Sequence, residues 1–364
     1  MARRAGAIVI PLVVVGLGVA LVQHGRGRAP RRAAGSSGGS KRPAAVASGS
    51  VVNLAPGSDP SVLPGPVLIA DSDNNRLIEV SPTGHVLWEF PRRGDLAPGQ
   101  TFRTPDDAFF ATDGRRVIAT QEEDFTISVI DLARDRIVYR YGHPGIPGSG
   151  SDYLDNPDDA LLMPTGQIRL ADIKNCRLVV IQPPAHQILR QLGLTGVCVH
   201  QPSVSFGSPN GWFPMRDGNA VVTEINGDWI DVLSPAGRVL TSTNAPGFTY
   251  PSDTNEVRPG VLLSADYANP GAIEMFTPRG QLLWRYAPSG PQALNNPSLA
   301  EPLPNGDVLA NDDHNNRVIV IDPHTDRIVW QYGHTHIAGR QPGYLADPDG
   351  VDLAPPYSLL ERIK

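Results

Sequence analysis

Acidic residues recur at fixed distances from prolines, and these acids are the residues of the chain best suited to bind a cation. An acid stands fifteen residues after a proline in four places, ending at Asp172, Glu224, Asp266 and Asp312. A second set of polar residues closely follows a proline: Asp106, Asp107, Asp158, Asp159, Asn210, Asp253 and Asp349. Carboxylate and amide oxygens are the ligands that Ca²⁺ prefers. The sequence therefore predicts a site for Ca²⁺ or another divalent cation, with Asp158, Asp253 and Asp349 as ligands.

A structural role for these acids is the alternative. Asp after Pro, and Asp at the end of a strand, commonly caps a turn by accepting backbone N–H groups. Repetition of the same acid in every unit of a repeat is what such a role predicts.

Four histidines are candidates for acid–base, nucleophilic or metal-binding chemistry, because a neutral imidazole can act in each way near pH 7. They are His143, His200, His314 and His334. The segments 141–157 and 332–348 are near duplicates, and each carries a Tyr-Gly-His motif and a second tyrosine. Duplication in only two units is harder to explain as general repeat structure. Exposed loop histidines without a catalytic role are the alternative.

The two cysteines, Cys176 and Cys198, fit a disulfide better than a metal site. Neither a zinc-ligand pattern nor a Cys-x-x-Cys motif is present. A disulfide between these two cysteines closes a loop of about 22 residues and contributes about 3 kcal/mol to stability. An exported protein would retain such a bridge. The alternative is a pair of buried free thiols.

The prolines also reveal the repeat that positions these residues. Pro105, Pro157, Pro209, Pro251, Pro297 and Pro348 are separated by 52, 52, 42, 46 and 51 residues. A period of this length is typical of propeller blades. Short segments with alternating apolar residues lie between turn residues, and 37 Gly and 36 Pro supply the turns. The sequence predicts an all-β, six-bladed β-propeller of four-stranded blades.

One blade of this predicted ring is split between the two ends of the domain. Residues 66–90 supply three of its strands, and the C-terminal strand at 348–354 supplies the fourth. Closing the ring in this way leaves no unpaired sheet edge between the first and last blades. In such blades the loop before the first strand and the loop between the second and third lie on one face. The two sets of acids and the four histidines are therefore expected on that face, near the central channel.

The N-terminal part has a different composition. Residues 5–22 are uncharged and mostly apolar, so residues 1–24 are expected to be a membrane anchor or a signal sequence. Residues 25–58 are expected to be a disordered linker, residues 59–356 the propeller and residues 357–364 a tail. We expect a single-pass protein of the cell membrane, with the propeller on the extracytoplasmic side. The net charge of −6 excludes a basic surface for nucleic acid.

Two motifs resemble known propeller families. The Asp-x-x-Asn-Asn-Arg segments at 71–76 and 312–317 resemble the NHL repeat. Trp88, Trp284 and Trp330 resemble the docking tryptophan of PQQ-like repeats, and Tyr139, Arg190 and Thr241 stand in its place in the other blades. Bacterial exported propellers of the arylsulfotransferase-like kind look similar over 60–356. That resemblance implies a channel-facing histidine with arginine partners, for which Arg103 and Arg340 are the nearest candidates. PQQ itself is not expected, because its dehydrogenases have eight blades and adjacent cysteines.

These observations favour a membrane-tethered extracytoplasmic propeller that acts as a binding module. Its ligand is expected to be a protein, a glycan or a small molecule, bound on the face that carries the acids and histidines. The alternative is an enzyme with its site at the channel mouth, either a metal-dependent hydrolase or lyase or an arylsulfotransferase-like transferase.

Overall fold

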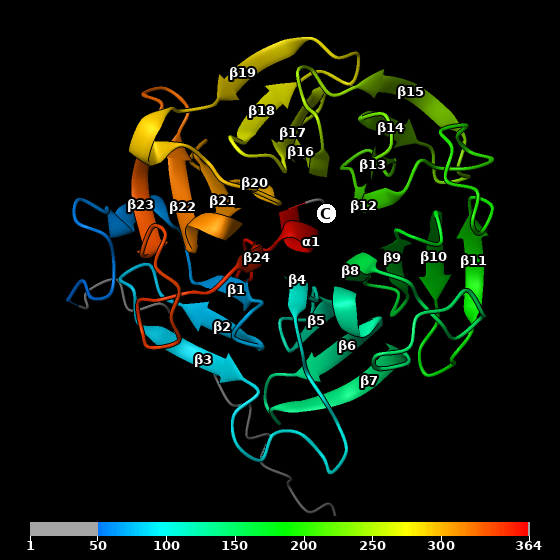
Figure 1. Cartoon of the computed structure of the whole chain (residues 1–364), viewed down its shortest axis with the longest axis horizontal. Helices are drawn as coiled ribbons and strands as arrows, with labels where there is room; N and C mark the ends of the chain where they lie inside the picture. Colours follow the sequence, from blue (N-terminus) through cyan, green and yellow to red (C-terminus); the bar gives the residue numbers. More distant parts are fainter. Residues whose placement is uncertain (1–49, 363–364) are drawn as a thin grey trace, which may run out of the picture. The chain divides into compact units, whose positions relative to one another are not determined.

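The computed structural model describes residues 50–362, and these form six four-stranded antiparallel sheets around a common centre (Figure 1). The chain is an all-β, six-bladed β-propeller, as the repeat predicted. The predicted anchor at 1–24 and most of the predicted linker at 25–58 lie outside the described residues. Between residues 50 and 362, no helix combines the length and the apolar character needed to cross a membrane.

The strands of each blade follow one another from the centre of the ring to its rim. Blade one contains β24 (Pro348–Leu353), β1 (Val67–Asp71), β2 (Arg76–Val80) and β3 (Val86–Phe90); blade two contains β4 (Pro105–Phe110), β5 (Arg116–Gln121), β6 (Thr126–Asp131) and β7 (Arg136–Gly142). Blade three contains β8 (Pro157–Leu162), β9 (Ile168–Asp172), β10 (Arg177–Ile181) and β11 (Ile188–Leu192); blade four contains β12 (Pro209–Pro214), β13 (Ala220–Glu224), β14 (Trp229–Leu233) and β15 (Val239–Asn244). Blade five contains β16 (Pro251–Arg258), β17 (Val261–Asp266), β18 (Ala272–Phe276) and β19 (Leu282–Tyr286); blade six contains β20 (Ala300–Pro302), β21 (Val308–Asp312), β22 (Arg317–Asp322) and β23 (Arg327–Gly333).

The ring is closed by the C-terminal strand, which confirms the prediction of a split blade. β24 pairs with β1 from Val67 opposite Leu353 to Ile69 opposite Val351. Residues just before the first strand protect the rim of blade six. The backbone N–H of Ala55 donates to Gln331, and that of Asp59 donates to Val329. Part of the segment expected to be linker thus covers an otherwise exposed strand edge.

Three of the acids that stand at the end of a second strand have a structural role. Asp71, Asp172 and Asp312 are buried, and each accepts a hydrogen bond from an arginine five residues later, at 2.6 to 2.7 Å. Each also accepts a backbone N–H from the connector that enters its blade, at 2.8 Å, from Ala346, Asp155 and Asn295 respectively. The acid therefore fixes the connector against the hairpin, and this explains why the Asp-Asn-Arg motif repeats.

The tryptophans of the outer strands join neighbouring blades. Trp88 donates to Asp135 of blade two, Trp284 to Asp326 of blade six and Trp330 to the carbonyl of Pro82 in blade one, at 2.8 to 2.9 Å. Tyr139 and Arg190, which replace the tryptophan, bond in the same way to the carbonyls of Ala185 and Pro235. The contact needs a long side chain with a donor at this position rather than a tryptophan in particular. Thr241 is too short, and its buried hydroxyl has no partner among the described residues.

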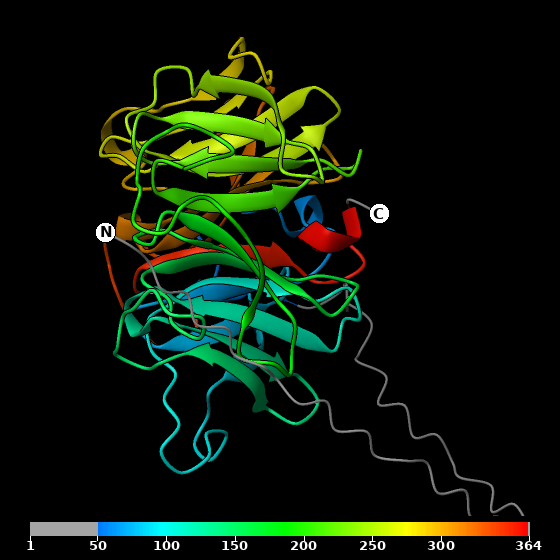
Figure 2. The same ribbon diagram turned by 90° about the vertical axis from the view of Figure 1, so that its right-hand side faces the viewer.

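The C-terminal tail, for which the sequence offered no role, closes one end of the ring. Helix α1 (Leu359–Arg362) lies at the centre of the ring, on the side towards which β24 runs (Figures 1 and 2). Leu359 and Leu360 are buried in the main core. Arg362 donates to Glu301 at 2.9 Å, and Glu301 is fully buried. The helix thus carries the cation that balances a carboxylate inside the ring.

We predict that Arg362→Leu destabilises the full-length protein by about 3 to 5 kcal/mol at pH 8, because it leaves the buried Glu301 carboxylate without its counter-ion. Chemical denaturation measures the change. Adding Glu301→Gln to this variant removes the charge and should recover most of the loss. An Arg362→Leu protein as stable as the wild type would contradict this role for α1.

Candidate functional site

The inner strands of blades two to five begin at a proline and then depart from regular pairing. In β4, β8, β12 and β16 the register with the next strand shifts within the first few residues. Asp159 and Asp253 have φ angles of 49° and 38°, the left-handed conformation in which non-glycine residues are uncommon. Irregularities of this kind redirect side chains and occur beside functional sites. Here they bring carboxyl groups of different blades together.

Five aspartates meet in this way, and we call them the central aspartate cluster: Asp106, Asp107, Asp158, Asp159 and Asp253. Carboxylate oxygens of Asp106, Asp107 and Asp158 all lie within 4.8 Å of one another, and so do those of Asp107, Asp159 and Asp253. Asp107 belongs to both groups. Blades two, three and five therefore supply one continuous set of oxygen ligands.

The cluster is buried and short of hydrogen-bond donors. All five side chains are less than 9% exposed. Within the described part of the chain, no donor outside the carboxyl groups reaches Oδ1 of Asp107, Oδ1 of Asp253 or either oxygen of Asp159. Gly211 leaves room beside them, since a Cβ there would stand 3.1 Å from Asp159 and 3.3 Å from Asp253. Buried oxygens without donors are costly, and a cation would relieve that cost.

Burial and mutual repulsion raise the pKa of every carboxyl group in the cluster. The pKa of Asp106, Asp107, Asp158 and Asp159 is held well above the usual range by burial first and by neighbouring carboxylates second. Burial raises the pKa of Asp253 to about 7, although a hydrogen bond with Asp159 opposes the rise. Without a cation, the cluster therefore retains protons near neutral pH.

The structure brings together only some of the residues predicted as cation ligands. Among the described residues no group of three possible ligands contains Asp158, Asp253 and Asp349 together, because Asp158 groups with Asp106 and Asp107, and Asp253 groups with Asp107 and Asp159. Asp349 instead accepts a hydrogen bond from Ser298 at 3.0 Å and interacts with Asp106. Asn210 is buried and donates to Ser252 at 3.2 Å, and its own oxygen has no partner among the described residues.

Two residues that the sequence analysis did not identify, Glu122 and Tyr250, interact with the central aspartate cluster. Glu122 accepts a hydrogen bond from Asn156 at 2.8 Å, and burial raises its pKa to about 7. The charges of Asp158 and Glu122 act on Tyr250, whose pKa is raised chiefly by burial. Tyr250 directly precedes Pro251, and Glu122 follows the last residue of β5. Their positions next to the repeat frame were the signal that could have identified them.

In the part of the chain that the structure describes, none of the four candidate histidines joins the central aspartate cluster in a group of possible metal ligands. His143 bonds to Asp152 at 3.0 Å and stacks on Tyr153, and His334 stacks on Tyr344 in the duplicated segment. His314 lies 3.8 Å from Asp347 and is exposed. Of the two candidate arginine partners, Arg103 is exposed and Arg340 pairs with Glu89 at 2.9 Å. In residues 50–362, His200 is the one histidine that joins a group of possible metal ligands, and this group lies in blade four.

The predicted disulfide between Cys176 and Cys198 is present. It ties the long connector between β11 and β12 to the turn between β9 and β10. His200 follows the bridge by two residues, so the disulfide restrains the loop that carries it.

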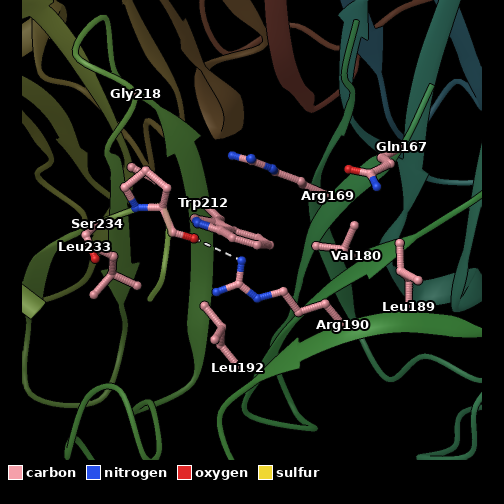
Figure 3. Close-up of a pocket in the computed structure, with 12 residues that line it drawn as sticks. Gln167, Arg169, Val180, Leu189, Arg190, Leu192, Trp212, Gly218, Leu233 and Ser234 are labelled. Atoms are coloured by element: carbon pink, nitrogen blue, oxygen red, sulfur yellow. Dashed lines mark hydrogen bonds between the residues drawn. The ribbon is translucent and has the colours of Figure 1, made fainter. Parts of the chain in front are cut away.

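A cavity of about 250 Å³ lies between blades three and four, on the face opposite the cluster (Figure 3). Arg169 stands over the ring of Trp212 at 5.2 Å. Arg190 points into the same space but donates to Pro235 (Figure 3). The cavity is lined mainly by strand residues of the two blades, together with the hairpin-turn residues Gln167, Gly218 and Ser234, and it contains none of the predicted site residues.

Comparison with known proteins supports the fold. No protein-family model and no curated protein matches the sequence. A protein of unknown function from Bacteroides caccae is similar in structure, with 15% identity and a TM-score of 0.54 over 79% of this chain and 98% of that one. A streptogramin B lyase is also 15% identical, with a TM-score of 0.51 over 83% of this chain and 94% of its own. At such identities the likeness shows the propeller fold alone. The NHL or PQQ-like type of the repeats stays a prediction.

We predict that the metal-free protein becomes more stable as the pH falls from 8 to 5.5. The folded-state pKa of Asp253 and Glu122 is about 7, well above that of an unfolded carboxyl group. At a pH between the pKa of the unfolded carboxyl group and that of the folded one, the folded state binds more protons than the unfolded state. The free energy of unfolding therefore rises as the pH is lowered through 7. Melting in the presence of a chelator should shift upwards by at least about 2 °C. A melting temperature that falls as the pH is lowered from 8 to 5.5 would contradict the conclusion that the central aspartate cluster retains protons near neutral pH.

Proposed function

We propose that this protein is a membrane-tethered extracytoplasmic β-propeller that acts as a binding module and holds a divalent cation in its central aspartate cluster. The observation that carries the proposal is the set of buried carboxylate oxygens, within 4.8 Å of one another, that lack other donors. An all-oxygen set fits Ca²⁺, which accepts many oxygen ligands in flexible geometry. The ligand of the module, a protein, a glycan or a small molecule, would bind on the same face.

The membrane tether rests on the sequence and on the disulfide. Residues 5–22 are uncharged, and a disulfide is retained in oxidising compartments outside the cytoplasm. The Asp-Asn-Arg contacts of blades one, three and six support an NHL-like repeat for the propeller that the tether would carry.

A propeller enzyme is the second candidate. It is favoured by carboxyl groups that keep a proton near pH 7, since such groups can serve as general acids. A lyase, hydrolase or transferase would use them at the centre of the ring. Turnover of a substrate separates the two candidates.

We predict that chelator-treated full-length protein binds about one Ca²⁺ in the cluster and melts at a higher temperature when Ca²⁺ is added. Asp159→Asn should weaken binding at least about 10-fold, because it removes one charged ligand. The same change should stabilise the metal-free protein at pH 8, because it removes one repelling charge. Calorimetric titration and melting curves measure both effects.

Asp322→Asn is the matched control for this experiment. Asp322 caps a hairpin turn on the opposite face, where it accepts the backbone N–H of His324. This variant should bind Ca²⁺ like the wild type. Absence of bound ion, together with a melting curve that Ca²⁺ leaves unchanged, would indicate that these aspartates only stabilise local turns. That result would overturn the cation proposal.

We predict that the propeller is exported. In spheroplasts of a bacterium that expresses the full chain, added protease should remove the propeller, and Cys176 and Cys198 should resist thiol reagents until a reductant is added. Deleting residues 5–22 should release the protein from the membrane fraction. Protection from protease and free thiols in intact spheroplasts would place the propeller in the cytoplasm instead.

A further inference from the structure

Blade four departs from the repeat at the position where other blades neutralise a buried acid. In blades one, three and six the acid at the end of the second strand pairs with Arg76, Arg177 or Arg317. In blade four that acid is Glu224, and the residue opposite it is Trp229. The usual arginine is therefore missing, and Glu224 needs another partner.

A second acid makes the charge imbalance larger. Asp231 lies two residues after Trp229, where blades one, three and six have Ile78, Val179 and Ile319. Blade five also has an acid at this position, but its Glu274 pairs with Arg285. Asp231 is opposite Ser242 instead. Blade four thus places two carboxyl groups side by side without an arginine.

His200 from the long connector lies against both acids. Its Nδ1 is 3.1 Å from Oε2 of Glu224 and 3.8 Å from Oδ2 of Asp231. The imidazole stacks on Trp229 with ring centres 4.0 Å apart and the planes nearly parallel. Its Nε2 is 3.2 Å from the hydroxyl of Ser242. The ring is thus held on three sides.

The two carboxyl groups are fully buried, but their hydrogen bonds are incomplete. Glu224 and Asp231 have no exposed surface. Oε1 of Glu224 and Oδ1 of Asp231 have no donor in the described structure apart from each other's carboxyl group. The side chain of His200 is 18% exposed. The group therefore contains buried carboxylate oxygens without hydrogen-bond donors, and the imidazole of His200 is partly exposed at the surface.

We propose that His200, Glu224 and Asp231 bind a first-row divalent transition metal such as Zn²⁺, with Ser242 as a positioning residue. Bonds of about 2.1 Å at tetrahedral angles place ligand atoms about 3.4 Å apart, and the distances of 3.1 and 3.8 Å bracket that value. Nδ1 would be the ligand atom, and Nε2–H would donate to Ser242, as metal-bound histidines commonly do with their second nitrogen.

This site differs in chemistry from the central aspartate cluster. A nitrogen ligand favours Zn²⁺ and its neighbours, whereas an all-oxygen set favours Ca²⁺. Three protein ligands leave the fourth position of Zn²⁺ for water or for an oxygen atom of a bound ligand. The exposed side of His200 gives that position access to solvent.

The experiment uses untagged, chelator-treated full-length protein and Co²⁺ as a visible probe. The wild type should bind one Co²⁺ at this site with the absorption of a tetrahedral site, lose the colour when Zn²⁺ is added, and melt at a higher temperature with Zn²⁺. His200→Gln should abolish the colour. Ser242→Ala should weaken Zn²⁺ binding about 10-fold.

Asp231→Val separates loss of the site from loss of the fold, because it installs the residue that blade three has at Val179. It should fold normally and bind no Co²⁺ here. Two controls should keep the colour: His334→Gln, which removes a stacked connector histidine without a carboxyl pair, and Asp159→Asn, which alters only the central cluster.

A colourless wild type with no stabilisation by Zn²⁺ would overturn the proposal, as would full colour in His200→Gln or Asp231→Val. The proposal is also overturned if the metal-free protein fails to bind Zn²⁺ and its Ser242 reacts with a fluorophosphonate. In that case His200 would act as a base for a serine nucleophile.

Discussion

Pairing of β24 with β1 is the contact on which the rest of the structure depends. It joins residues nearly three hundred positions apart and converts six separate sheets into a closed ring. A ring has a centre to which every blade contributes its inner strand, and the first residues of those strands are forced close to one another. The site at the centre is thus a consequence of closure, since no single blade contains it.

Closure also has an electrostatic cost. It brings Asp107 of blade two, Asp159 of blade three and Asp253 of blade five within 4.8 Å in a buried place. Two carboxylates at such distances in a medium of low dielectric constant repel strongly, so the group must retain protons or hold a cation. In blades one, three and six the same fold neutralises the buried acid at the end of the second strand with an arginine, as with Asp172 and Arg177. The contrast separates acids that fix the backbone from acids that have no structural partner.

Blade four shows the same contrast within one repeat position. Replacement of the expected arginine by Trp229, and of an apolar residue by Asp231, gives up stabilising contacts that blades one, three and six keep. The disulfide, the stacking of His200 on Trp229 and the bond to Ser242 hold the resulting group in place. Local departures from a repeat are expected where a protein exchanges stability for a site.

The sequence by itself determined the fold, because the proline period, the turn residues and the alternating strands are local signals that each blade repeats. It also predicted that the C-terminal strand completes blade one, and it favoured a disulfide between Cys176 and Cys198. It could not decide which acids lack a partner. Asp71 and Asp158 look alike as acids near a strand boundary, and only the tertiary structure shows that the first meets Arg76 and the second meets Asp106 and Asp107. It also could not place Arg362 or His200. Their partners Glu301 and Asp231 lie on strands distant in the sequence, and the contact of a tail or a connector with such a strand depends on a three-dimensional arrangement that spacing along the chain does not encode.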